Sequence, residues 1–268
     1  MRTVWLLTDY GIDDPWVGVV KAVIERTAPG TRTFDLTHSI PGGDVALGAI
    51  RLADCAPWLP ADAVAMAVVD PGVGGPRRAV AVATADGPLL VGPDNGLLGP
   101  AVSRLGGATS AVEVSASEWL PDEPSATFHG RDVFAPVAAR LAAGEPLRSA
   151  GAPLEPSSLS VIPAPAAAIE QGVVEATVAV VDRYGNLSLA VTATECSGLL
   201  SHDRTVTVAA AGRTHPATVA RTFSGVPAGT ALVHEDSDGR LAIAVNGGSA
   251  AALLGATVGT GVTVEWGA

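Results

Sequence analysis

Two aspartates stand where a ligand-binding site of an α/β protein would need them. Asp9 follows the apolar run VWLLT (4–8), and Asp70 ends AVAMAVVD (63–70), so each lies at the carboxyl end of a predicted strand. In open α/β sheets, ligands bind outside these strand ends. Asp70 is followed by PGVGG (71–75), whose glycines would let the backbone approach a ligand, and then by Arg77. The spacing leaves open a plain turn in which the aspartate accepts local N–H groups.

The glycine-rich stretch GVGGPRR (72–78) does not have the spacing of a phosphate-binding loop. It matches neither GxxxxGK[ST] nor GxGxxG, and a proline stands where an amide would face phosphate. The sequence therefore disfavours a nucleotide-phosphate site at this position.

Three further stretches place polar side chains at a predicted turn or helix start. In TFHGRDVF (127–134), His129 precedes a helix and Asp132 falls in its first turn, where an acid is favourable. A capped helix with a solvated histidine explains this stretch equally well. In VVDRYGNLSL (180–189) and GPDNGLLGP (92–100), the polar residues are also typical of turns.

The sequence indicates neither a metal site nor a common nucleophile motif. The five histidines form no HxH or HExxH pattern, no GxSxG is present, and Cys55 and Cys196 form no CxxC. We therefore expect no metal ion and no cofactor.

Composition limits the possible partners and location. The net charge of −11 argues against a nucleic-acid groove, which needs clustered Lys and Arg. Neither a signal pattern nor an apolar run of about 18 residues without a charge or a Pro/Gly break is present, so we expect no membrane span. Two distant cysteines fit a reducing, cytoplasmic location.

The first 150 residues alternate predicted strands and helices, which favours an α/β domain with a largely parallel sheet. Strands are expected at 4–8, 32–37, 63–70, 79–84 and 88–92. Helices are expected at 14–26, 43–58, 95–106 and 130–144, the first with Asp14 as its N-cap.

Residues 151–170 are rich in Pro, Ser and Ala and are predicted to form a linker. Beyond them, residues 171–268 contain strand after strand, with one short helix expected at 247–255. This pattern is typical of an all-β domain, a small barrel or a sandwich.

Taken together, six motifs resemble one family, the S-adenosyl-L-methionine hydrolases, also called S-adenosyl-L-methionine hydroxide adenosyltransferases. The motifs are LLTDYGIDDPWVGVVKAVI, DLTHSIPGGDVALGA, VVDPGVGGPRR, GPDNGLLGP, FHGRDVFAPVAARLAAG and VDRYGNLSL, in the order of the family. The resemblance implies an N-terminal α/β domain, a C-terminal β-barrel, and a homotrimer with substrate at subunit interfaces. The family is related to the fluorinase and chlorinase enzymes, which attack the same substrate with halide.

The resemblance also implies which residues form the site. The family's Asp-Arg-His set around the attacking water falls on Asp70, Arg77 and His129. The residues implied to contact substrate are Asp9 on the ribose diol, Asp14 and Trp16 in the same loop, Gly130, Asp182 on the methionine ammonium, Tyr184 stacking nearby, and Asn186 on adenine.

Two positions distinguish this sequence from the halogenating relatives. They carry a tyrosine at the position of Asp70, and a tryptophan that packs on the sugar where this chain has Gly43. The implied reaction is attack of water on ribose C5′, which releases methionine as a neutral thioether and needs no metal. Asp70 or His129 could accept the proton of the water, since Arg77 stays protonated. A halide-dependent adenosyl transferase and a non-catalytic adenosine-binding module are the alternatives.

Overall fold

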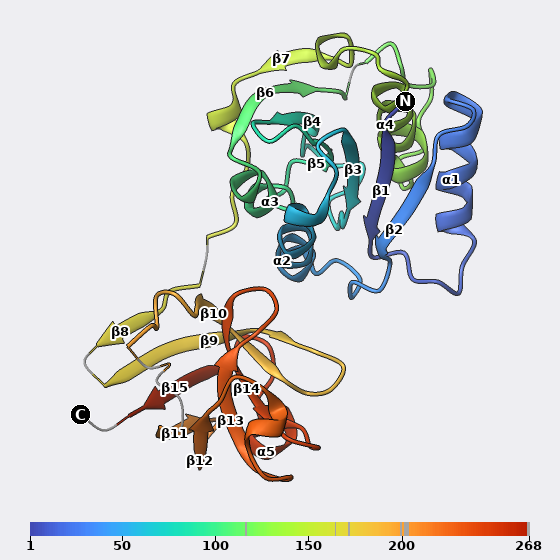
Figure 1. The fold of residues 1–268 in the computed structure, drawn as a ribbon. Coiled ribbons are helices and arrows are strands. Elements are labelled where there is room, and N and C mark those ends of the chain that lie inside the picture. The colour runs from blue at the N-terminus through green and yellow to red at the C-terminus, as the bar shows by residue number, and fades with distance from the viewer. Residues whose placement is uncertain (116, 164, 171, 199, 201–203, 267–268) are drawn as a thin grey trace. The chain divides into compact units, whose positions relative to one another are not determined.

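The computed structural model describes residues 1–115, 117–163, 165–170, 172–198, 200 and 204–266. The chain divides into two compact units, Met1–Ile162 and Pro163–Ala268 (Figure 1). The first unit is α/β and the second is a β-barrel, so the predicted fold class is confirmed. The segment 151–170 contributes one strand to each unit, β7 (Ala152–Leu154) and β8 (Ala168–Glu170).

In the described part of the first unit, seven strands form one sheet in the order β2-β1-β3-β5-β4-β6-β7. Strands β2, β1, β3 and β5 pair in parallel, whereas β4, β6 and β7 join the sheet through antiparallel pairs. Besides β7, the strands are β1 (Thr3–Thr8), β2 (Thr33–Thr37), β3 (Ala63–Val68), β4 (Ala79–Thr84), β5 (Leu89–Pro93) and β6 (Ala108–Glu113).

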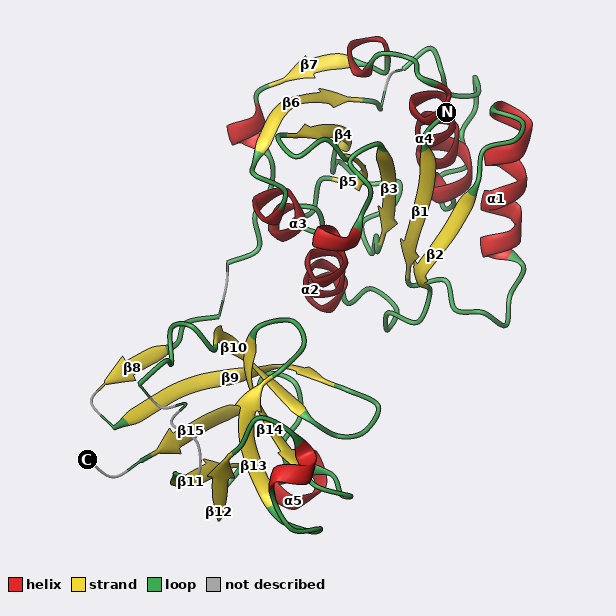
Figure 2. Ribbon diagram, in the orientation of Figure 1, coloured by secondary structure: helices red, strands yellow, loops and turns green. Residues whose placement is uncertain are grey.

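Helices cover both faces of this sheet (Figure 2). One face packs against α1 (Trp16–Thr27) and α4 (Ala135–Ala143), and the other against α2 (Val45–Cys55) and α3 (Gly99–Arg104). A π-helical turn, η2 (Gly130–Phe134), leads directly into α4. Short 3₁₀ turns are η1 (Ala56–Trp58), η3 (Leu147–Ser149) and η4 (Pro156–Ser158).

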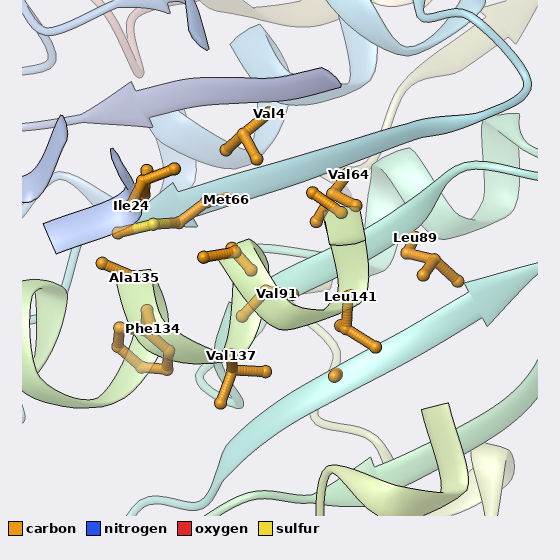
Figure 3. Close-up of a cluster of buried hydrophobic side chains, with 14 of the residues drawn as sticks. Val4, Ile24, Val64, Met66, Leu89, Val91, Phe134, Ala135, Val137 and Leu141 are labelled. Atoms are coloured by element: carbon orange, nitrogen blue, oxygen red, sulfur yellow. The ribbon is translucent and has the colours of Figure 1, made fainter. Parts of the chain in front are cut away.

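The alternation of side chains along β3 explains how one strand serves both faces. Val64 and Met66 point into the cluster with α1 and α4, while Ala63 and Ala65 point toward α2 and α3. Figure 3 shows Met66 beside Ile24 of α1 and near Phe134. The apolar run predicted as a buried strand is therefore buried on both faces, as expected for a parallel sheet covered by helices.

The second unit is a barrel of seven strands within the described ranges. The ladder β10-β14-β13-β12-β11-β15-β9 closes because β9 also pairs with β10. The short strand β8 pairs with β9 as an addition to this closed ladder. The strands are β9 (Val173–Val181), β10 (Leu187–Thr192), β11 (Thr205–Ala210), β12 (Arg213–Val219), β13 (Ala231–Glu235), β14 (Arg240–Val245) and β15 (Gly261–Glu265). The expected short helix is α5 (Ala250–Leu254), and a 3₁₀ turn, η5 (Phe223–Gly225), precedes β13.

The start of α1 differs from the sequence-based expectation. The helix begins at Trp16, its N-cap residue is Pro15, and no side chain caps it. Asp14 is exposed, so the prediction that it caps the helix is wrong. Among the described helices, none combines the length and the apolar character needed to cross a membrane.

Candidate active site

Asp70 and Arg77 form a closely fitted ion pair at the edge of the sheet. Arg77 Nε donates to both carboxylate oxygens of Asp70, at 3.1 and 3.0 Å, and a terminal nitrogen donates to Oδ2 at 2.5 Å. The two side chains are only 5% and 11% exposed. The guanidinium also lies over the ring of Phe134, 5.5 Å from its centroid. Arg77 is therefore held by charge on one side and by an aromatic face on another.

The same terminal nitrogen of Arg77 lies 2.7 Å from Nδ1 of His129. Because a guanidinium can only donate, Nδ1 must present its lone pair, and the ring proton of a neutral His129 is on Nε2. Burial and the positive charge of Arg77 lower the pKa of His129 below its usual value of 6.5. The arrangement therefore stabilises a neutral imidazole whose N–H points away from Arg77.

The glycine turn after Asp70 packs closely against the loop that precedes His129, and this close approach requires glycine. Gly74 has φ +75°, and a Cβ at this position would collide with the backbone carbonyl oxygen of Ala126. The second loop is fixed by Asp132, which accepts from the backbone N–H of Ser125 at 2.8 Å. The hydrogen bond from Arg131 keeps the pKa of Asp132 below its usual value. The two loops thereby hold Arg77 and His129 at hydrogen-bonding distance.

Asp9 lies at the matching end of the neighbouring strand. β1 and β3 are parallel, with Thr8 paired to Val68, so Asp9 and Asp70 extend from the same edge of the sheet. Asp9 Oδ2 accepts from the backbone N–H of Gly43 at 2.8 Å. The two aspartates therefore lie at the same edge of the sheet, and the ligand site there stays a prediction.

Trp16 reaches this region through an aromatic contact. Trp16 is 45% exposed and meets the edge of Phe128, with ring centroids 5.4 Å apart. Phe128 also meets Tyr10 edge-to-face at 5.7 Å. Asp14 is exposed and contributes no cap to α1.

Tyr10 also lies at this site, although no sequence motif pointed to it. A Cβ at Gly130 would collide with the hydroxyl oxygen of Tyr10, which places this hydroxyl directly beside the backbone that carries His129. Burial and the carboxylates of Asp9 and Asp70 raise the pKa of Tyr10 well above its usual range. Its position immediately after Asp9, at the same strand end, was the available signal.

In the barrel unit, Asp182 organises the turn between β9 and β10. Its carboxylate accepts from the backbone N–H groups of Tyr184 and Asn186, at 2.8 and 2.9 Å, and from the Asn186 side chain at 2.7 Å. Gly185 has φ +81°, and a Cβ there would collide with Ser249. The turn interpretation is therefore correct for this stretch, and it still leaves the Asn186 amide fixed in orientation.

Tyr184 and Asn186 also line a pocket of the barrel unit of about 510 Å³, together with Phe223, Val245 and Asn246. Tyr184 is 70% exposed there. A flat aromatic ring beside an oriented amide could bind a heteroaromatic group by stacking and edge hydrogen bonds.

The polar residues of GPDNGLLGP hold structure. Asn95 donates to the carbonyl oxygen of Val69 at 2.9 Å, and Asp94 accepts from Arg78 at 2.8 Å. Asp94 also accepts from the backbone of Ser160 at 2.7 Å, which fixes the end of the first unit. The conformational interpretation therefore accounts for these residues.

Two family models match this chain. Residues 4–151 match the SAM hydroxide adenosyltransferase N-terminal domain, and residues 176–263 match the SAM hydroxide adenosyltransferase C-terminal domain. The matched ranges together span most of both units.

Two curated relatives match almost the whole chain, and a third matches about two thirds of it. An (R)-S-adenosyl-L-methionine hydrolase of Salinispora tropica is 49% identical over 267 residues, 99% of each chain. A protein of the same name from Thermus thermophilus is 40% identical over 263 residues, 95% of this chain and 96% of its own. A fluorinase from an Actinoplanes species is more distant, at 28% identity over 205 residues and 68% of each chain.

Solved structures show the same fold. An uncharacterized conserved protein from Thermotoga maritima superposes with a TM-score of 0.92 at 35% identity, over 98% of this chain and 100% of that one. A conserved hypothetical protein from Thermus thermophilus gives 0.76 at 39% identity, over 98% and 100%. The sequence motifs, the fold and the two matched domains agree, and the chain belongs to the SAM hydroxide adenosyltransferase family.

Proposed function

We propose that this protein is an enzyme that hydrolyses S-adenosyl-L-methionine to adenosine and L-methionine. The observation that carries the proposal is the cluster of Asp70, Arg77 and His129 at the sheet edge, in a chain 49% identical to curated hydrolases. The electrophile carries its own activation, because a sulfonium leaves as a neutral thioether. The protein therefore has to supply an oriented water molecule and a proton acceptor for it.

Within this proposal, Asp70 is the residue that takes the proton. The Nδ1 lone pair of His129 already accepts from Arg77, so His129 can only donate from Nε2 in its neutral form. Two nitrogens of Arg77 donate hydrogen bonds to the Asp70 carboxylate, whose two oxygens together still have a lone pair for a water O–H. Arg77 and the Nε2–H of His129 would then stabilise hydroxide character on the attacking oxygen.

The oxygen–C5′ bond forms as the C5′–sulfur bond breaks, with the electron pair going to sulfur and the proton to Asp70. We propose that the substrate is held by the residues that the family resemblance implies. Asp9 would accept from the ribose hydroxyls beside Asp14, Trp16 and Gly130. Asp182 would meet the methionine ammonium, with Tyr184 and Asn186 on the adenine.

Purified protein given S-adenosyl-L-methionine should release adenosine and methionine in equal amounts without added metal.

Molar chloride or fluoride should leave adenosine as the product, because the carboxylate of Asp70 opposes a second anion. At about 4 Å and an effective dielectric of 20, this repulsion is of order 4 kcal/mol, and Arg77 offsets part of it. Chromatography of the products with and without halide makes the measurement.

A halogenated nucleoside that grows with halide at the expense of adenosine would instead support the halide-dependent alternative. Binding of S-adenosyl-L-methionine without any turnover would support the non-catalytic module. Either result contradicts the proposed hydrolysis.

Variants of the cluster should lower kcat more than they weaken substrate binding, because their proposed role is toward the water. Asp70→Asn should lose about 100-fold or more, the range of general-base catalysis, and Arg77→Ala and His129→Ala about tenfold or more. Asp9→Ala and Asn186→Ala should chiefly raise the substrate Kd. Steady-state kinetics and calorimetric binding separate these effects.

Asp62→Asn is the matched control for Asp70→Asn, because Asp62 is an exposed aspartate of the same unit. It should retain wild-type kcat. A fully active Asp70→Asn variant would overturn the assignment of the proton acceptor.

The pKa of His129 should be visible in a pH titration of its ring by NMR. Burial and Arg77 lower this pKa, so the midpoint of the titration should lie below 6.5. In Arg77→Ala the midpoint should move up, because the repelling charge is gone. A wild-type midpoint at or above 6.5, or no change in the variant, would contradict the described contact.

We also propose that the chain forms a homotrimer with active sites where copies meet. The support is that residues proposed for one substrate are divided between the two units, and that the family resemblance implies such interfaces. Light scattering should then give about three times the mass of one chain, a closed assembly. A monomer with full activity would count against interface sites.

A cytoplasmic location is proposed as well, on the ground of two distant cysteines in the whole sequence. Cell fractionation tests it, and recovery of the protein only from an oxidising compartment would contradict it.

A further inference from the structure

The phenol of Tyr10 lies beside the backbone that carries His129, and it has no part in the proton transfer to Asp70. Its backbone N–H donates to Thr8 Oγ1 at 3.2 Å, and the same oxygen lies 2.8 Å from Nδ1 of the buried His38. The ring packs against the core and meets the edge of Phe128. Both ends of the residue are thus held, and its hydroxyl has a defined position.

The hydroxyl explains why residue 130 is glycine. Gly130 is buried at the start of η2, and its backbone does not need a left-handed conformation. An added Cβ would collide with the Tyr10 hydroxyl oxygen and would lie 2.9 Å from the ring carbon Cζ. The space beside His129 is therefore filled by the Tyr10 side chain.

The O–H of Tyr10 is available to donate a hydrogen bond. Within the described part of the chain, no protein group is hydrogen-bonded to it, whereas Arg77 and His129 are engaged with each other. The nearby carboxylates of Asp9 and Asp70 and the burial of the ring raise its pKa, so the phenol keeps its proton. A phenol that stays protonated beside a carboxylate cannot serve as a base, and it remains a neutral hydrogen-bond donor.

We propose that Tyr10 is a further catalytic residue, whose hydroxyl donates a hydrogen bond to the oxygen of the attacking water. This inference rests on the proposed hydrolysis. The water would attack C5′ with one lone pair, accept from Tyr10 with the other, and give one proton to Asp70. The lone pair left behind by that proton would accept from the Nε2–H of His129, while Arg77 acts through its charge. Tyr10 keeps its own proton throughout, and Gly130 provides the room that its hydroxyl needs.

Four proteins test the proposal: the wild type, Tyr10→Phe, Gly130→Ala and the double variant. Tyr10→Phe should lower kcat about tenfold or more with little change in KM or Tm, because it removes a donor to the reacting oxygen and no packing. Gly130→Ala should lower both kcat and Tm through the collision. In the Tyr10→Phe background the colliding oxygen is absent, so Gly130→Ala should lower kcat and Tm by less than it does in the wild type.

Two control variants match these changes elsewhere in the first unit. Ser103→Ala removes a hydroxyl on α3 that donates a hydrogen bond to the carbonyl oxygen of Gly99. Gly18→Ala adds a Cβ on α1, where no atom beyond its chain neighbours and the helix backbone lies within 4 Å. Both should retain wild-type kcat.

Wild-type kcat in Tyr10→Phe would overturn the catalytic role, and so would a loss that comes with a higher KM and a lower Tm. Equal effects of Gly130→Ala in both backgrounds would overturn the packing argument. A wild type that forms no adenosine would be a failure of the proposed function, seen before any variant is made, and the Tm comparison would still test the contact.

Discussion

One guanidinium, that of Arg77, sets the chemistry of this site. It neutralises Asp70 through hydrogen bonds to both oxygens, and it takes the Nδ1 lone pair of His129. The first contact supplies hydrogen-bond donors to both oxygens of a nearly buried carboxylate, and the second fixes which nitrogen of a neutral imidazole carries the proton. The proposed division of labour, with Asp70 as base and His129 as donor, follows from these two contacts.

The rest of the first unit holds this guanidinium in place. Parallel pairing of β1 and β3 brings the ends of two strands together, so that Asp9, Tyr10 and Asp70 share one edge. A left-handed glycine, Gly74, lets the loop of Arg77 touch the loop of His129 at Ala126. Behind them, Phe134 is fully buried in the core and also faces the Arg77 guanidinium, so packing and charge support the same geometry.

The sequence predicted those features that are local. Apolar runs that end in Asp9 and Asp70 predicted two strands and the residues at their carboxyl ends, because strand ends and turns follow from neighbouring residues. Only the family resemblance grouped Arg77 with His129, and no sequence pattern indicated their hydrogen bond or the close approach of Tyr10 to Gly130. Both join positions far apart in the chain. Asp14 had the residue type and position of a helix cap, yet the helix begins at Trp16 without a side-chain cap.

The proposed chemistry depends on attack of water at C5′ of the substrate. Hydrolysis of S-adenosyl-L-methionine in ¹⁸O-enriched water, followed by mass spectrometry of both products, tests this most directly. The heavy oxygen should appear in the 5′-hydroxyl of adenosine, and methionine should stay unlabelled. Label in the amino-acid product, or adenosine without label, would contradict it.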